Sequence, residues 1–142
     1  MDARITFITL AVADIAASHR FYVDGLGWEP QFEAPGEVIF FRVAPTLVLS
    51  LWSRDDFIAE VGAAPAQGVP PITLAHNMPD RAGVDDVLRD AAAAGATVVA
   101  AQARDWGGYS GYFVDPDGFR WEIAHNPTPL GDELMRAAGV ID

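Results

Sequence analysis

The alternation of hydrophobic and polar positions runs through the same order of elements twice along the chain. In the first half, apolar and β-branched runs predict strands, and apolar residues at helical spacing predict one helix. Asp14 is placed to cap this helix, and Gly25 and Gly27 to end it. The predicted order is strand, helix and three strands, at 5–12, 15–26, 28–33, 38–43 and 47–52.

The second half repeats this order after a segment rich in Pro, Gly and Ala. A strand, a helix and three strands are expected at 72–77, 83–94, 97–101, 111–115 and 120–125. Asp115-Pro116-Asp117-Gly118 is typical of a hairpin turn between the last two strands. The predicted division is a first module at 1–55, a connector at 56–70, a second module at 71–127 and a tail at 128–142 with a short helix.

The two halves also share a short sequence segment. Ile8-Thr9-Leu10-Ala11 recurs as Ile72-Thr73-Leu74-Ala75. Four common residues can repeat by chance. The same order of elements surrounds both copies, however, and this favours an internal duplication.

Composition narrows the classes of function. The 142 residues include 51% hydrophobic residues, enough for a real core, and no cysteine, which excludes disulfides and thiolate chemistry. A net charge of −11, without a single lysine, disfavours binding to nucleic acid or to anionic membrane surfaces. No apolar run is long enough to span a bilayer, and the N-terminus does not resemble a signal peptide, so we expect a cytoplasmic protein.

Two segments carry a family resemblance: FITLAVADIAASHRFYVDGLGWEP at 7–30 and GYFVDPDGFRWEIAHNP at 111–127. They resemble the glyoxalase/bleomycin-resistance/extradiol-dioxygenase (vicinal oxygen chelate) superfamily. The resemblance implies an α+β fold of two βαβββ modules whose curved mixed sheets enclose a cavity. The modules would pair within one chain or across a homodimer, and a homodimer is expected.

The resemblance also implies four metal-ligand positions, one on the first and one on the last strand of each module. They fall on Phe7, on Leu49 or its neighbour Ser50, on Pro71 and on Glu122. Only Glu122 has a side chain suited to a first-row metal, whereas catalytic sites use three or more protein ligands. We therefore expect no metal and no other cofactor, and the pattern disfavours glyoxalase I and extradiol dioxygenase activity.

Strand alternation predicts what lines the cavity instead. Counting from Phe7 and Pro71 assigns a largely apolar set to the cavity, with Leu47 and Leu51 beside Leu49 and with Ala75 and Ala124 beside Glu122. An aromatic segment enters the closing strand of the second module and forms either a stacking wall for a planar ligand or a packed turn. The predicted ligand contacts are Phe7, Thr9, Leu49, Thr73, Trp106, Tyr109, Tyr112 and Arg120.

Three interpretations of Glu122 remain open. A buried carboxyl among apolar groups would have a raised pKa, which suits a general base or a hydrogen-bond donor. It could form a structural ion pair with Arg120 or Arg42, or it could be an inherited residue without a role. The histidines, His19, His76 and His125, are expected to be structural, with a metal site of two histidines near one acid as the alternative.

Three functions follow as hypotheses. The first is a non-enzymatic protein that binds a small aromatic or cationic molecule. The second is a metal-independent isomerase or lyase in which Glu122 is the catalytic base. The third is a metal-dependent lactoylglutathione-lyase or dioxygenase-type enzyme, which requires a different alignment of the ligand positions.

Overall fold

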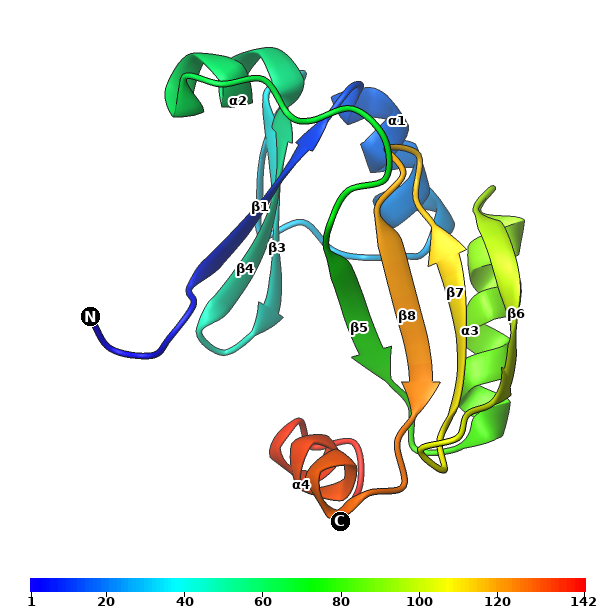
Figure 1. Cartoon of the computed structure of the whole chain (residues 1–142). Helices are drawn as coiled ribbons and strands as arrows, with labels where there is room; N and C mark the ends of the chain where they lie inside the picture. The colour runs from blue at the N-terminus through cyan, green and yellow to red at the C-terminus, as the bar shows by residue number, and fades with distance from the viewer. The chain divides into compact units, whose positions relative to one another are not determined.

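The computed structural model describes residues 1–142 and divides the chain into two compact units, Met1–Gly68 and Val69–Asp142 (Figure 1). Each unit holds one four-stranded mixed sheet, and we describe each by itself. The predicted α+β class with two βαβββ modules is confirmed.

The first module has the strand order β1-β4-β3-β2, with β1 and β4 parallel and the other neighbours antiparallel. Its helical segments are α1, the π-helical η1 and α2. The bounds are β1 (Phe7–Val12), α1 (Ile15–His19), η1 (Arg20–Gly25), β2 (Phe32–Ala34), β3 (Val38–Ala44), β4 (Leu47–Ser53) and α2 (Arg54–Val61).

Two features of the first module differ from the sequence-based expectation. The helix expected over 15–26 turns π-helical at Arg20, and the strand expected from Trp28 begins only at Phe32. Trp28 packs in the core instead, with its ring centroid 5.4 Å from that of Tyr22 and 5.3 Å from that of Phe41. Its backbone N–H bonds the Tyr22 carbonyl at 2.9 Å, which keeps this residue out of the sheet.

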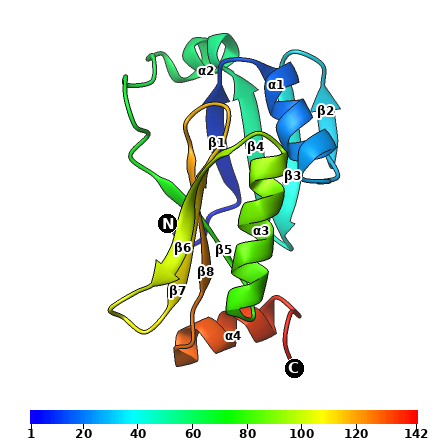
Figure 2. The same cartoon turned by 90° about the vertical axis from the view of Figure 1, so that its right-hand side faces the viewer.

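The second module repeats the topology with the order β5-β8-β7-β6. Figure 1 and Figure 2 show α3 lying along one face of this sheet. The bounds are β5 (Thr73–Asn77), α3 (Arg81–Ala93), β6 (Thr97–Ala103), β7 (Tyr109–Val114), β8 (Arg120–His125) and α4 (Pro129–Ala137). Both β7 and β6 are longer than expected, so the hairpin between them is short.

Side-chain caps explain where the helices begin. Asp14 accepts a hydrogen bond from the Ala16 N–H at 2.8 Å at the start of α1. Asp80 accepts one from the Gly83 N–H at 2.8 Å at the start of α3. Each cap satisfies a backbone donor that the helix leaves free, which fixes the first turn.

Each core lies between the sheet and its helix. In the first module, Leu10, Val12, Ile39, Leu49 and Leu51 are buried on the helix side of the sheet. In the second module, the α3 residues Val84, Leu88 and Ala91 face a buried set made by Phe113, Trp121 and Ile123. Gly111 lies on the same side, and a Cβ there would sit 2.6 Å from Leu88 Cδ1, so α3 packs close against β7 at this point. All the helices are too short or too polar to span a lipid bilayer.

Candidate functional site

Each sheet has a helix packed on one face, α1 on the first sheet and α3 on the second. We call the opposite face the open face. Cross-strand partners share a face, so the register identifies its residues. On the second sheet, one row runs across β5, β8, β7 and β6 as Ala75, Glu122, Tyr112 and Val99. The parallel row contains Thr73, Arg120 and Val114. The predicted placement of Thr73, Ala75, Arg120, Glu122 and Ala124 on one face agrees with this register, whereas their contact with a ligand stays a prediction.

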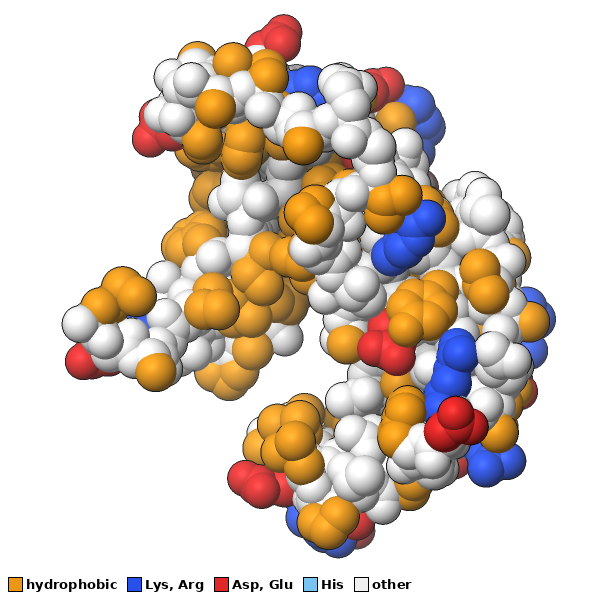
Figure 3. Space-filling model, in the orientation of Figure 1, with side chains coloured by type: hydrophobic (Ala, Val, Ile, Leu, Met, Phe, Trp, Pro, Cys, Tyr) orange, Lys and Arg blue, Asp and Glu red, His pale blue; other side chains and the backbone are white.

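A polar cluster lies in the middle of this open face. The Tyr112 hydroxyl donates to Glu122 Oε1 at 3.2 Å. The Arg104 guanidinium lies over the Tyr112 ring, 5.9 Å from its centroid, and donates to the Ser110 hydroxyl and carbonyl at 2.9 Å each. The Glu122 carboxylate, the Tyr112 phenol and the Arg104 guanidinium therefore lie side by side. Figure 3 shows acidic and basic side chains beside hydrophobic ones in the region of β7 and β8.

The electrostatics keep this phenol protonated. Burial, followed by the charge of Glu122 and the hydrogen bond to it, raises the pKa of Tyr112 above its ordinary value, while Arg104 acts in the opposite direction. The hydroxyl is thus a hydrogen-bond donor at neutral pH and orients one oxygen of Glu122. The second carboxylate oxygen is available to a ligand donor.

Glu122 is only half-buried and its partner is Tyr112. The predicted ion pair with Arg120 does not form. Arg42, the other predicted partner, donates instead to Gln31 Oε1 at 3.0 Å and to the Pro45 carbonyl at 2.9 Å within the first module. Of the interpretations left open by the sequence, a hydrogen-bonding or proton-accepting role fits this geometry best.

The open face of the first sheet is aromatic. Phe40 lies between two exposed phenylalanines, with its centroid 5.6 Å from Phe7 and 5.5 Å from Phe32. Phe7 and Phe32 are 52% and 53% exposed, which is unusual for side chains of this size. Figure 3 shows hydrophobic side chains gathered over β1 and β4. Phe7 and Thr9 face this side as predicted, whereas Phe32 and Phe40 were not singled out.

Leu49 does not face this side, and the prediction for it, Leu47 and Leu51 is wrong by one residue. In the parallel β1–β4 pair, Phe7 lies beside Val48, and Thr9 lies beside Ser50. Leu49 is therefore beside Ile8 on the helix side and is 2% exposed. Packing the leucines against the helix buries more apolar surface than packing Ser50 there, which decides the register.

Tyr109 also points away from the open face. It shares the helix side with Gly111 and Phe113, and its hydroxyl donates to Asp85 of α3 at 2.9 Å. This hydrogen bond raises the pKa of Tyr109. The sequence predicted that Tyr109 contacts a ligand on the cavity wall. This is wrong, because Tyr109 contacts α3 instead. Trp106 lies in the β6–β7 hairpin, is 49% exposed and folds its ring over Gly108.

The histidines occupy other places. His76 and His125 alternate with the open-face residues and lie on the helix side, and His125 Nδ1 is 3.4 Å from the Met78 carbonyl. His19 lies on α1 between two carboxylates. No group of three or more His, Asp and Glu side chains in residues 1–142 is arranged to hold a metal ion.

The family's metal positions can be tested against these faces. Beside Glu122 on the second sheet lie Ala75 and Tyr112, and on the first sheet Phe7 lies beside Val48, and Thr9 lies beside Ser50. One carboxylate is the sole strong ligand in this set, which does not fit a catalytic metal of three or four protein ligands.

The model of the Glyoxalase/Bleomycin resistance protein/Dioxygenase superfamily matches residues 4–123. The chain belongs to this superfamily. No curated protein sequence matches the chain. The superfamily fold accounts for both the duplicated topology and the placement of the open faces on equivalent strands of the two modules.

Solved structures of the superfamily resemble the chain closely. A glyoxalase-related enzyme from Fulvimarina pelagi is 38% identical, with a TM-score of 0.81 over 88% of this chain and 89% of that one. A lactoylglutathione lyase from Agrobacterium tumefaciens is 26% identical, with a TM-score of 0.68 over 89% of this chain and 96% of that one. A glyoxalase/bleomycin resistance protein/dioxygenase from Nocardioides, 23% identical with a TM-score of 0.72, shows the fold alone.

Proposed function

We propose that this superfamily member binds a small aromatic or cationic molecule on the open face of its second sheet without a catalytic metal. The observation that carries the proposal is the Tyr112–Glu122 pair, which lies between Ala75 and Val99 in one row and is flanked by Arg104. Binding sites for small molecules combine apolar surface with a few polar groups that fix orientation, and Ala75, Val99 and Val114 lie beside the pair on this face.

The polar cluster suits a ligand that carries at least one hydrogen-bond donor. The free lone pairs of Glu122 accept from such a donor, and a cationic donor gains from the net charge of −11. The first sheet, described by itself, exposes Phe7 and Phe32 on its open face. A homodimer remains part of this proposal, because an exposed aromatic face of this kind is commonly covered by a partner.

Binding is tested with a library of planar aromatic compounds, neutral and cationic, screened by thermal shift and mapped by NMR on labelled protein. We expect hits that perturb residues of the second open face. Glu122→Gln and Tyr112→Phe should each weaken a hit about tenfold, because each removes one member of the hydrogen-bonded pair.

Glu133→Gln is the matched control, since it removes the same charge from the exposed surface of α4 and should leave affinity unchanged. A library without hits, or hits whose affinity ignores both Glu122→Gln and Tyr112→Phe, would contradict the proposal.

A second candidate function rests on the same carboxylate. Glu122 is half-buried, oriented by the Tyr112 phenol and beside apolar neighbours, so it could accept a proton from a bound substrate as the base of an isomerase or lyase. The variant Glu122→Gln separates the two candidates. A binder loses affinity about tenfold, whereas a base-dependent enzyme loses about 10²–10⁴-fold in turnover.

A further inference from the structure

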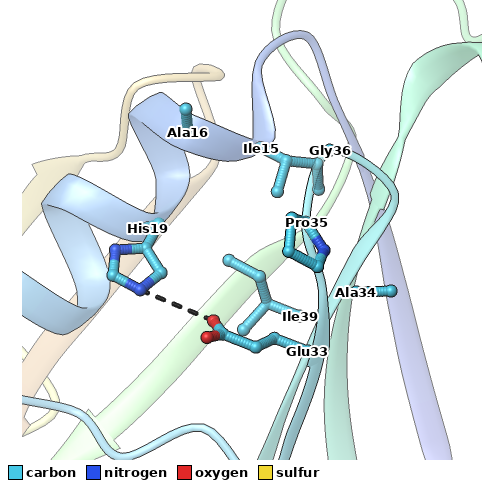
Figure 4. Close-up of a pocket in the computed structure, with 8 residues that line it drawn as sticks. All are labelled: Ile15, Ala16, His19, Glu33, Ala34, Pro35, Gly36 and Ile39. Atoms are coloured by element: carbon cyan, nitrogen blue, oxygen red, sulfur yellow. Dashed lines mark ion pairs between the residues drawn. The ribbon is translucent and has the colours of Figure 1, made fainter.

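A groove lies on the helix side of the first module, between α1 and the hairpin formed by β2 and β3. It has a volume of about 270 Å³. Its walls are apolar and include Ile15, Pro35 and Ile39, as Figure 4 shows. The groove is on the opposite side of the sheet from Phe7 and Phe40, so it is separate from the open face described above.

One carboxylate projects into this apolar groove. Glu33 pairs with Ile39 across β2 and β3, and this register turns its side chain toward α1. Figure 4 shows His19 reaching toward it from the helix, with Nε2 3.5 Å from Glu33 Oε2. The other ring nitrogen of His19 is 3.8 Å from Asp24 Oδ1, so two carboxylates from two elements flank the imidazole.

No arginine balances this charge. Arg20, the cation nearest in sequence to His19, lies 3.9 Å from Asp14, and Arg42 donates to Gln31 and to the Pro45 carbonyl. Glu33 is 46% exposed, which leaves room for a ligand to approach its free oxygen. The groove thus has apolar walls and a carboxylate at its opening.

We infer that this groove binds a small organic cation with an apolar body, whose ammonium group pairs with Glu33 and whose apolar part packs on Ile15, Pro35 and Ile39. A volume of about 270 Å³ is just below the usual range for drug-sized ligands, so a single-ring amine is the expected size. The same carboxylate disfavours an anion of the same shape.

Three probes with one apolar body test this: phenethylammonium, 2-phenylethanol and 3-phenylpropanoate. Their binding to full-length labelled protein is followed by amide chemical shifts. We expect phenethylammonium to bind with a dissociation constant on the order of millimolar, because a ligand of this size has few contacts, and to shift residues 15–39. The alcohol should bind about fivefold more weakly, and the carboxylate more weakly still.

Two variants on one hairpin separate a local pair from the general attraction of an acidic protein for cations. Glu33→Gln should weaken phenethylammonium about fivefold, while Glu37→Gln, which removes the same charge outside the groove, should leave it unchanged. Ala16→Leu, which fills the groove from α1, should abolish all binding there.

Equal affinity for the amine and the alcohol, or equal effects of Glu33→Gln and Glu37→Gln, would overturn the inference. Shifts confined to residues 109–125 would overturn it as well, and would support the open-face site instead. Ligand binding in the groove, with no ligand binding on the open face, would contradict only the proposed function.

Discussion

Replacing Trp121 with alanine is expected to destabilise the second module by about 3–5 kcal/mol. Trp121 is 6% exposed, and its ring stacks on Phe113 with the centroids 5.8 Å apart and the planes 12° from parallel. The truncation removes this contact and leaves a cavity beneath α3. Because a domain of this size is stable by only about 5–15 kcal/mol, much of the margin would be lost.

Trp106→Ala is the matched control for this prediction. The same truncation is made at a side chain that is 49% exposed in the β6–β7 hairpin, so stability should change by less than about 0.5 kcal/mol. Urea unfolding followed by far-UV circular dichroism measures both variants without relying on tryptophan fluorescence. Equal losses for the two variants, or a loss below about 1 kcal/mol for Trp121→Ala, would contradict the assigned core.

Introducing Ala75→His together with Tyr112→His is expected to create a metal site around Glu122. The three positions are direct neighbours on β5, β8 and β7 and share the open face. Neighbouring strands are about 4.8 Å apart, so two imidazoles and one carboxylate can converge on a single ion. Affinity for Zn²⁺ should rise by roughly a hundredfold or more over the unaltered protein, whose lone carboxylate binds weakly.

Calorimetry with Zn²⁺ measures this gain, and the visible absorption of bound Co²⁺ reports the coordination geometry. The control adds Glu122→Gln to the double variant, which should weaken the site because one of three ligands becomes neutral. No gain in affinity, or a gain that survives Glu122→Gln unchanged, would contradict the placement of Glu122 in this row. A gain in affinity would show that the backbone geometry of this face can support a metal site, and that the natural residues lack the ligands.

Much of the fold could be predicted because its signals are local. Asp14 and the left-handed Gly27 mark the two ends of the first helical segment, and Gly95 ends α3 with a φ of 100°. The turn at Asp115–Gly118 forms as expected, with the Gly118 N–H bonded to the Asp115 carbonyl at 3.1 Å. These residues act on their own neighbours, so the sequence suffices.

It was harder to predict which face of the sheet each side chain occupies, because the pairing of the strands determines it. The set Leu47, Leu49 and Leu51 could face either way until β1 pairs with β4 and places Ser50 beside Thr9. The sequence carried a signal for the correct face, since Ser50 is the one polar residue within the apolar run 47–52.

The guanidinium of the candidate site was missed for a related reason. A register shift between Val99 and Gln102 extends β6 to Ala103, beyond the end expected at Ala101. The extension brings Arg104 back over Tyr112 and Ser110. Irregularities of this kind depend on the partner strand, so no local sequence pattern around Arg104 predicts its position.

Metal analysis of the purified protein shows whether the chain holds a catalytic ion. The protein is produced with Ni, Zn, Fe and Mn supplied together, exchanged into chelator-free buffer and measured by elemental mass spectrometry. The lone carboxylate of Glu122, beside Ala75 and Tyr112, predicts less than about 0.1 ion per chain. One ion per chain that a chelator removes and added metal restores would contradict this prediction.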